Sequence, residues 1–154
     1  MEARSGGRLS AAERWLREAA EAGAEPDAAM FNNLIKAAAI KGDLPAAERW
    51  FTRAVQSRVS PDKHTFNAII GAAAKVGNLA AAEHWYGVAR ASKLQVGAVA
   101  FGAIVSVAVA ERDMKAAKHW FEIALKSGMD PAWLEIGSGT YTKLLLEARK
   151  NGDL

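Results

Sequence analysis

The 154-residue sequence contains no cysteine. This absence excludes disulfide bonds, thiolate nucleophiles and metal sites with sulfur ligands. Long apolar stretches are also missing, because the longest one, residues 98–110, is shorter than the about 20 residues of a membrane-spanning helix. The first ten residues, MEARSGGRLS, lack the apolar segment of a secretory signal. We therefore expect no membrane partner.

The residues that catalysis requires are scarce as well. The sequence offers no plausible Ser-His-acid set and no pair of carboxylates predicted to share a concave face, so we expect neither an enzyme nor a small-molecule substrate or cofactor. His84 and His119 are one repeat apart and could suggest zinc, but two further ligands are missing. Arg14 and Arg49 hold the same repeat position. We interpret it as an exposed basic position and predict no metal site.

The composition favours helices and permits an anionic partner. Hydrophobic residues make up 51% of the chain, and many of them are alanine, which favours helix and allows close helix packing. The predicted fold class is all-α. A net charge of +3 and a pI near 9.3 are compatible with binding to a polyanion but do not require it.

A spacing of 35 residues recurs along the chain. It separates four of the five tryptophans, Trp15, Trp50, Trp85 and Trp120, and it also separates Leu9, Leu44, Leu79 and Met114. A spacing shared by several positions indicates an array of structural repeats, in which each unit packs only against its neighbours. We therefore expect a single elongated domain over residues 1–154.

Each unit is predicted to contain two helices. In residues 32–62 two apolar helical patterns are separated by Gly42-Asp43 and followed by Pro61-Asp62. The chain then divides into a partial repeat, three full repeats, an insertion and a second partial repeat: 1–27, 28–62, 63–97, 98–132, 133–137 and 138–154. Because both ends fall inside a repeat, we expect a piece of a longer array.

The tryptophans have two possible roles. An aromatic ladder could stack on nucleic-acid bases. However, each tryptophan lies beside Leu16, Phe51, Tyr86 or Phe121 on a second helix and continues its apolar stripe. We predict that all four pack between repeats.

Four short segments resemble the pentatricopeptide repeat. They are MFNNLI at 30–35 and TFNAII at 65–70, which are similar to the family's opening motif, KVGNL at 75–79, and VSPD at 59–62. The resemblance implies a right-handed α-solenoid of helix-turn-helix hairpins that binds single-stranded RNA at one base per repeat. It also implies a role in RNA processing or stability, in a mitochondrion or plastid.

By this resemblance the base-reading residues are Asn32 with Asp62, which favours uracil, and Asn67 with Gly97, which favours a pyrimidine but lacks the second reader. Gly102 with Ala132 offers no hydrogen bond, and Thr142 favours a purine. Val99 matches the residue that wedges between bases, a place that Ala29 and His64 hold in the other repeats. Lys75 and Lys150 match a phosphate-binding lysine late in the first helix.

The placement of charge agrees with an RNA-binding face. Acidic residues are scarce in the predicted first helices and gather in the second helices. Lys36 and Lys143 lie in first helices, so we predict that they contact phosphate together with Lys75 and Lys150. A protein-binding groove could carry the same pattern, and residues 98–110, which have no charge, would suit it. A scaffold that binds other protein subunits is therefore the alternative.

Overall fold

The computed structural model describes residues 6–129, and within this range it contains seven helices and no strands. The helices are α1 (Gly6–Glu21), α2 (Ala28–Ile40), α3 (Leu44–Gln56), α4 (Lys63–Lys75), α5 (Leu79–Ala91), α6 (Ala98–Ala110) and α7 (Met114–Lys126). The starts of α2, α4 and α6 are 35 residues apart, as are those of α3, α5 and α7. The predicted all-α class and helical repeat are confirmed.

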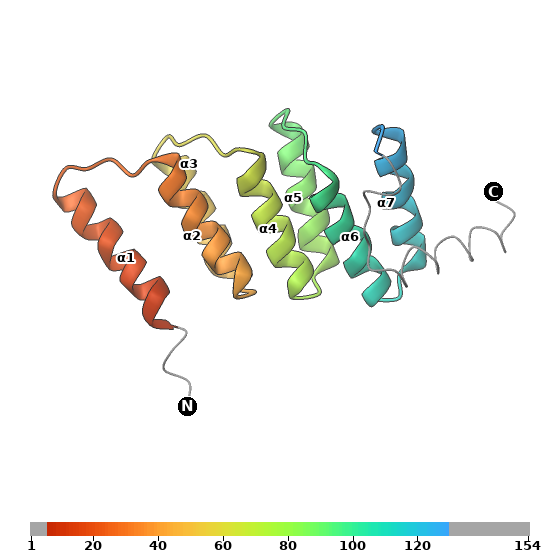
Figure 1. The fold of residues 1–154 in the computed structure, drawn as a ribbon, viewed down its shortest axis with the longest axis horizontal. Coiled ribbons are helices and arrows are strands. Elements are labelled where there is room, and N and C mark those ends of the chain that lie inside the picture. The colour runs from red at the N-terminus through yellow and green to blue at the C-terminus, as the bar shows by residue number, and fades with distance from the viewer. Residues whose placement is uncertain (1–5, 130–154) are drawn as a thin grey trace, which may run out of the picture.

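The helices form hairpins that stand side by side in a row (Figure 1). Each first helix, α2, α4 or α6, packs against the second helix of its own hairpin. Helix α4 also packs closely against both α2 and α6. Each second helix before α7 packs against the first helix of the next hairpin, and it makes less contact with the second helix of that hairpin. The more tightly packed layer of first helices is therefore the inner layer of the array.

Short turns connect the two helices of each hairpin. After α2, Gly42 adopts the left-handed conformation with φ 70°, and the N–H of Asp43 donates to the carbonyl of Ala38 at 3.0 Å. This arrangement ends the helix. The Asp43 side chain then accepts a bond from the N–H of Ala46 at 3.0 Å and caps α3. The predicted break at Gly42-Asp43 is thus both the end of one helix and the start of the next.

Tryptophan packing joins neighbouring hairpins. The Trp85 ring lies 4.8 Å from the Phe51 ring, and its Nε1–H donates to Glu48 Oε1 at 2.9 Å. One repeat later, Trp120 packs 4.7 Å from Tyr86 and donates to Glu83 Oε1. Trp50, Trp85 and Trp120 are buried, as predicted.

The prediction of a buried Trp15 is wrong, since 68% of its surface is exposed. Trp85 is covered by Phe66, from the first helix of its own hairpin, and by Phe51, from the hairpin before it. Helix α1 is a second helix with neither kind of neighbour before it among residues 6–129. Leu16, at the register of Phe51, is buried, and α1 packs against α2 of the following hairpin.

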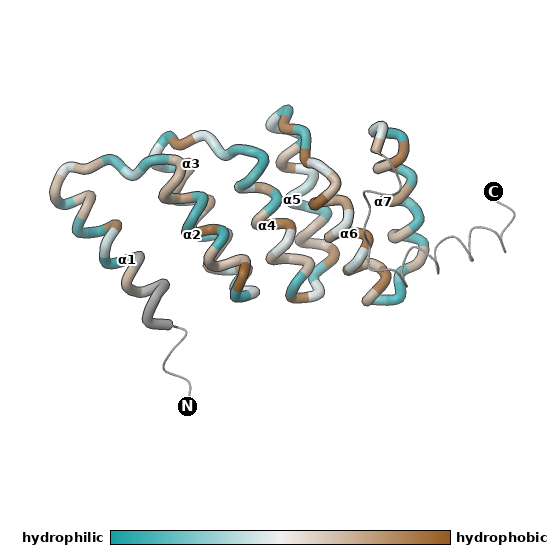
Figure 2. Tube along the Cα trace, viewed as in Figure 1, coloured by the Kyte–Doolittle hydropathy of each residue, from teal (hydrophilic) through white to brown (hydrophobic). Residues whose placement is uncertain are grey.

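Helix α6 is the most apolar helix, and Figure 2 shows it mainly in the hydrophobic colours. Its residues Phe101, Ile104, Val105 and Ala108 are buried, but Val99 is 69% exposed. The uncharged helix therefore contributes both to the core and to the surface of the inner layer. None of the described helices has the length and hydrophobicity needed to cross a bilayer.

Candidate nucleic-acid interface

One exposed or half-buried stripe runs along each first helix, and together the three stripes form what we call the inner face. Helices α2, α4 and α6 contain no aspartate or glutamate, so the inner face carries no carboxylate on these helices. These helices therefore do not repel phosphate. The inner face consists of Ala29, Asn32, Asn33, Lys36 and Ile40 on α2, His64, Asn67, Ala68, Gly71 and Lys75 on α4, and Val99, Gly102, Ala103, Ser106 and Ala110 on α6.

The structure brings the predicted readers Asn32 and Asp62 together. Asp62 precedes α4, and because α2 and α4 lie side by side, it reaches Asn32 in α2. The Nδ2 of Asn32 donates to Asp62 Oδ2 at 3.2 Å. The Thr65 hydroxyl donates to Asn32 Oδ1 and also lies 3.1 Å from Asp62 Oδ1. A residue pair separated by 30 positions thus forms one polar cluster with Thr65.

Asp62 is also the N-cap of α4. Its Oδ1 accepts from the Thr65 N–H at 2.9 Å, and its own N–H donates to the Thr65 hydroxyl at 3.1 Å, which makes a reciprocal capping box. Burial alone would raise the pKa of Asp62, but the hydrogen bonds from Thr65 and His64 outweigh it and lower the pKa below its ordinary value. The carboxylate is therefore ionised at neutral pH and accepts hydrogen bonds only.

Asn67 occupies the same position in the next repeat without such partners. Its Oδ1 atom is buried and has no hydrogen-bond partner. The positions that correspond to Asp62 and Thr65 are Gly97 and Ala100, and Gly97 makes no side-chain cap for α6. The second reader is therefore absent at Gly97, as predicted, and Ala100 separately lacks the hydroxyl that would meet the Asn67 carbonyl.

Gly102 continues the series on α6 and offers no side chain. A Cβ atom placed on Gly102 would meet nothing within 4 Å, so the position faces open space. The third described repeat therefore has no polar group at the predicted reading position.

A cavity of about 440 Å³ lies in the inner face beside Asn67. Its volume is within the range of about 300–1,000 Å³ that holds drug-sized ligands, which includes a nucleotide. The predicted residues Lys36, Asn67 and Val99 all line it, although they come from three different helices. His64 lines the same cavity, so the wedge positions of two successive repeats, His64 and Val99, both border the space next to Asn67.

Lys75 lies at the end of α4, on the rim of the inner face. Its ammonium group donates to the carbonyl of Ile40, the last residue of α2. A cation at this place complements the partial negative charge of a helix C-terminus. An ammonium has three N–H donors, so two remain for a phosphate. Lys36 is exposed in the middle of the same face.

The other predicted site residues lie outside the described range. They are Ala132, the partner position of Gly102, and Thr142, Lys143 and Lys150 of the last partial repeat.

Thr65 and His64 are not among the site residues predicted from the sequence. Thr65 is buried and joins both readers. Its signal in the sequence was an aspartate followed three residues later by a hydroxyl residue at a helix start, which is a capping-box pattern. His64 holds the wedge place but was not predicted to contact a base, and its exposed ring borders the cavity and can stack on a base.

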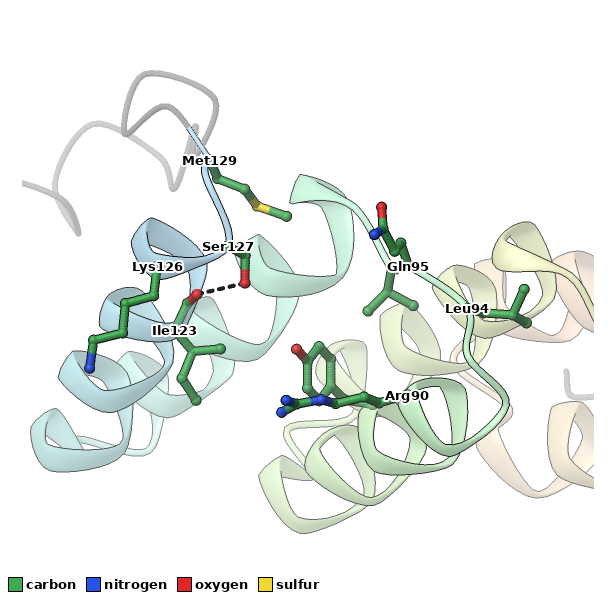
Figure 3. Close-up of a pocket in the computed structure, with 9 residues that line it drawn as sticks. Arg90, Leu94, Gln95, Ile123, Lys126, Ser127 and Met129 are labelled. Atoms are coloured by element: carbon green, nitrogen blue, oxygen red, sulfur yellow. Dashed lines mark hydrogen bonds between the residues drawn. The ribbon is translucent and has the colours of Figure 1, made fainter.

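A second hollow, of about 560 Å³, lies between the ends of α5 and α7 and is drawn in Figure 3. It is lined by Arg90, Gln95, Ile123 and Met129 among others. One repeat earlier, Val55 and Ser60 stand in place of Arg90 and Gln95. Its chemistry therefore does not recur along the array, as a row of base sites would. The described residues also contain no cluster of three potential metal ligands.

Comparison with known proteins agrees with the geometry. The family model for the pentatricopeptide repeat domain matches residues 14–78. A search of curated proteins gives no match.

Solved structures share the fold. The crystal structure of the pentatricopeptide repeat protein PPR10 from maize has a TM-score of 0.74 and 21% identity, and the match covers 94% of this chain and 22% of that one. The structure of PPR10 in complex with an 18-nt psaJ RNA element has a TM-score of 0.68 and 23% identity, and the match covers 80% of this chain and 18% of that one. The PPR domain of Arabidopsis thaliana protein-only RNase P 1, in complex with tRNA, has a TM-score of 0.71 and 18% identity, and the match covers 95% of this chain and 83% of that one.

This chain spans about a fifth of the length of PPR10. The likeness to these structures shows that the fold is shared, from the first described hairpin to the last. The family match covers residues 14–78, and the same 35-residue hairpin continues in register through α7. Residues 14–78 therefore match the pentatricopeptide repeat family, and the described chain shares the fold of its solved structures.

Proposed function

We propose that this chain binds single-stranded RNA along its inner face, at one base per repeat. The observation that carries the proposal is the Asn32–Asp62 pair, held on a face whose helices bear no carboxylate. Amide and carboxylate groups recognise the edges of unstacked bases by hydrogen bonding. First helices without acidic side chains accept the phosphate backbone. The RNA complexes of PPR10 and protein-only RNase P 1 support the same partner.

Each repeat has its own part in the proposed binding. Asn32 and Asp62 read a base at the first full repeat, and Asn67 reads the next one from the cavity that His64 and Val99 border. Gly102 reads none. Lys36 and Lys75 hold phosphates, and Thr142, Lys143 and Lys150 extend the track. The base order from the N-terminal repeat onward is uracil, pyrimidine, any base, purine.

The protein acts in this proposal by binding and not by catalysis, as part of RNA processing or stability. Its family resemblance supports an organellar location. A second candidate function is a protein-interaction scaffold. The observation that favours it is the uncharged surface of α6, where Val99 is 69% exposed.

Titration with short uridine-rich and adenosine-rich single strands tests the proposal, with fluorescence anisotropy as the readout. We expect uridine-rich RNA to bind more tightly, with a Kd in the micromolar range or weaker, because only a few repeats make contacts. With two or three phosphate contacts, the logarithm of affinity should fall against the logarithm of salt with a slope of about −1.4 to −2. If neither strand binds at low salt, the RNA proposal is wrong and the scaffold is favoured.

A further inference from the structure

The two asparagines of the inner face have the same repeat position but different surroundings. Asn32 has a partner on each end of its amide, because Nδ2 donates to Asp62 and Oδ1 accepts from Thr65. Asn67 has neither partner, and its Oδ1 is buried and unpaired. We infer that Thr65 is a positioning residue that orients the Asn32 amide for base selection, and that the absence of its hydroxyl at Ala100 leaves Asn67 free to turn. The inference rests on the proposed RNA binding.

The orientation of Asn32 follows from the chemistry of its partners. An ionised carboxylate only accepts hydrogen bonds, so the end of the amide that faces Asp62 must be the NH₂ group. The carbonyl end is held by the Thr65 hydroxyl, which the next helix contributes. Thr65 is only 2% exposed, so water does not compete for this bond. Both ends of the amide are therefore occupied, and exchange of its nitrogen and oxygen would turn the carbonyl towards the Asp62 carboxylate and lose the bond between them.

A fixed amide presents its groups to the RNA in fixed directions. With one lone pair of Oδ1 engaged by Thr65 and one N–H by Asp62, Asn32 keeps one N–H donor and one lone pair, whose directions are set by these two bonds. Uracil carries an acceptor oxygen at C4, whereas cytosine carries an NH₂ donor at the same place. A donor held in place therefore distinguishes the two pyrimidines. Without the hydroxyl, the amide can swing away and the discrimination should fall.

The amide of Asn67 is not held in this way. It can present its carbonyl to the NH₂ group of cytosine or its own NH₂ to the carbonyl of uracil, since neither end is engaged. Rotation costs no protein hydrogen bond. The repeat of residues 63–97 therefore accepts both pyrimidines, while the repeat of residues 28–62 selects uracil.

The chain allows the cluster of one repeat to be rebuilt in the next. Gly97 has φ −86°, and a Cβ atom there would meet nothing within 4 Å, so aspartate fits without backbone strain. Ala100 is fully buried, and Thr65 at the matching position of the repeat before it is also buried. The double substitution Gly97→Asp with Ala100→Thr should therefore supply both partners to Asn67, together with the missing cap of α6.

The experiment removes the hydroxyl in one repeat and adds the cluster in the other. The probes are short uridine oligomers in which each position in turn carries cytidine, and the readout is the ratio of Kd values for cytidine and uridine at each position. For Thr65→Val we expect the largest ratio to fall about fivefold, the effect of one hydrogen bond of about 1 kcal/mol. Thr65→Ser keeps the hydroxyl and should retain the ratio. Gly97→Asp/Ala100→Thr should create a second sensitive position next to the first.

The outcomes separate this inference from the proposed function. If the unaltered protein binds none of the oligomers, the proposed function fails, and NMR of the side-chain amides then tests positioning by itself. The Asn32 NH₂ signals should change in Thr65→Val and stay in place in Thr65→Ser. If RNA binds but Thr65→Val keeps the full ratio while thermal unfolding shows it folded, the positioning role is overturned.

Discussion

Replacement of Trp85 by alanine is expected to destabilise the protein by about 3–5 kcal/mol, the usual loss for a buried tryptophan. The indole packs 4.8 Å from the Phe51 ring and 6.4 Å from the Phe66 ring, and it is only 8% exposed. Truncation also leaves Glu48 without its indole donor. Because a repeat array depends on the interfaces between neighbouring units, the loss should weaken the whole fold. Urea unfolding followed by circular dichroism measures it.

Trp15 provides a matched control, since it has the same side chain at the same repeat position but is 68% exposed. Trp15→Ala should change the free energy of unfolding by less than about 0.5 kcal/mol, as exposed substitutions usually do. Similar losses for the two variants would show that Trp15 is buried in solution, for example by an association that covers α1. A negligible loss for Trp85→Ala would contradict the packing between hairpins.

Reversal of two charges on the inner face should largely abolish RNA binding. In Lys36→Glu/Lys75→Glu, two cations that attract phosphate become anions that repel it, and we expect an affinity loss of about 10- to 100-fold at low salt, since each charge contact near a protein surface contributes on the order of 1 kcal/mol or more. The difference from the unaltered protein should shrink as salt rises, because screening weakens these interactions. Anisotropy titrations at two salt concentrations give both quantities.

The control for this variant is Lys93→Glu/Lys115→Glu, which makes the same change in net charge at exposed lysines outside the inner face. It should reduce affinity by less than about threefold, through long-range repulsion only. Equal losses in both double variants would mean that net charge alone drives binding. Because Lys75 also bonds to the Ile40 carbonyl, unfolding curves must show that the Lys36→Glu/Lys75→Glu variant remains folded.

Much of the fold could be predicted because it depends on local patterns. The turn at Gly42-Asp43 follows from a left-handed glycine and a capping aspartate that are adjacent in the chain. The burial of Phe31 and Ile35 follows from helical periodicity. Trp15 shows the limit of this reasoning. Periodicity identifies the face that a helix would bury, but the neighbour that covers it is a property of the array.

The site was predictable only in part. Asn32, Asp62 and Asn67 were identified from the repeat motif, and the structure adds the contact between Asn32 and Asp62. The role of Thr65 depends on the distance between two helices, because its bond to Asn32 joins residues 33 positions apart. The same is true of the bond from Lys75 to the Ile40 carbonyl, which crosses a full repeat.

By itself the sequence determined the all-α class, the 35-residue repeat, the position of each turn and the scarcity of acidic side chains in the first helices. These features depend on residue type and spacing along one chain segment. The tertiary structure decided which groups meet across repeats. It gathered Lys36, Asn67 and Val99 around one cavity, and it gave Asn32 two partners while leaving Asn67 with none. The physical reason is that side-by-side packing of parallel helices places equivalent positions of neighbouring repeats in contact, so the residue at one position sets the environment of another a whole repeat away.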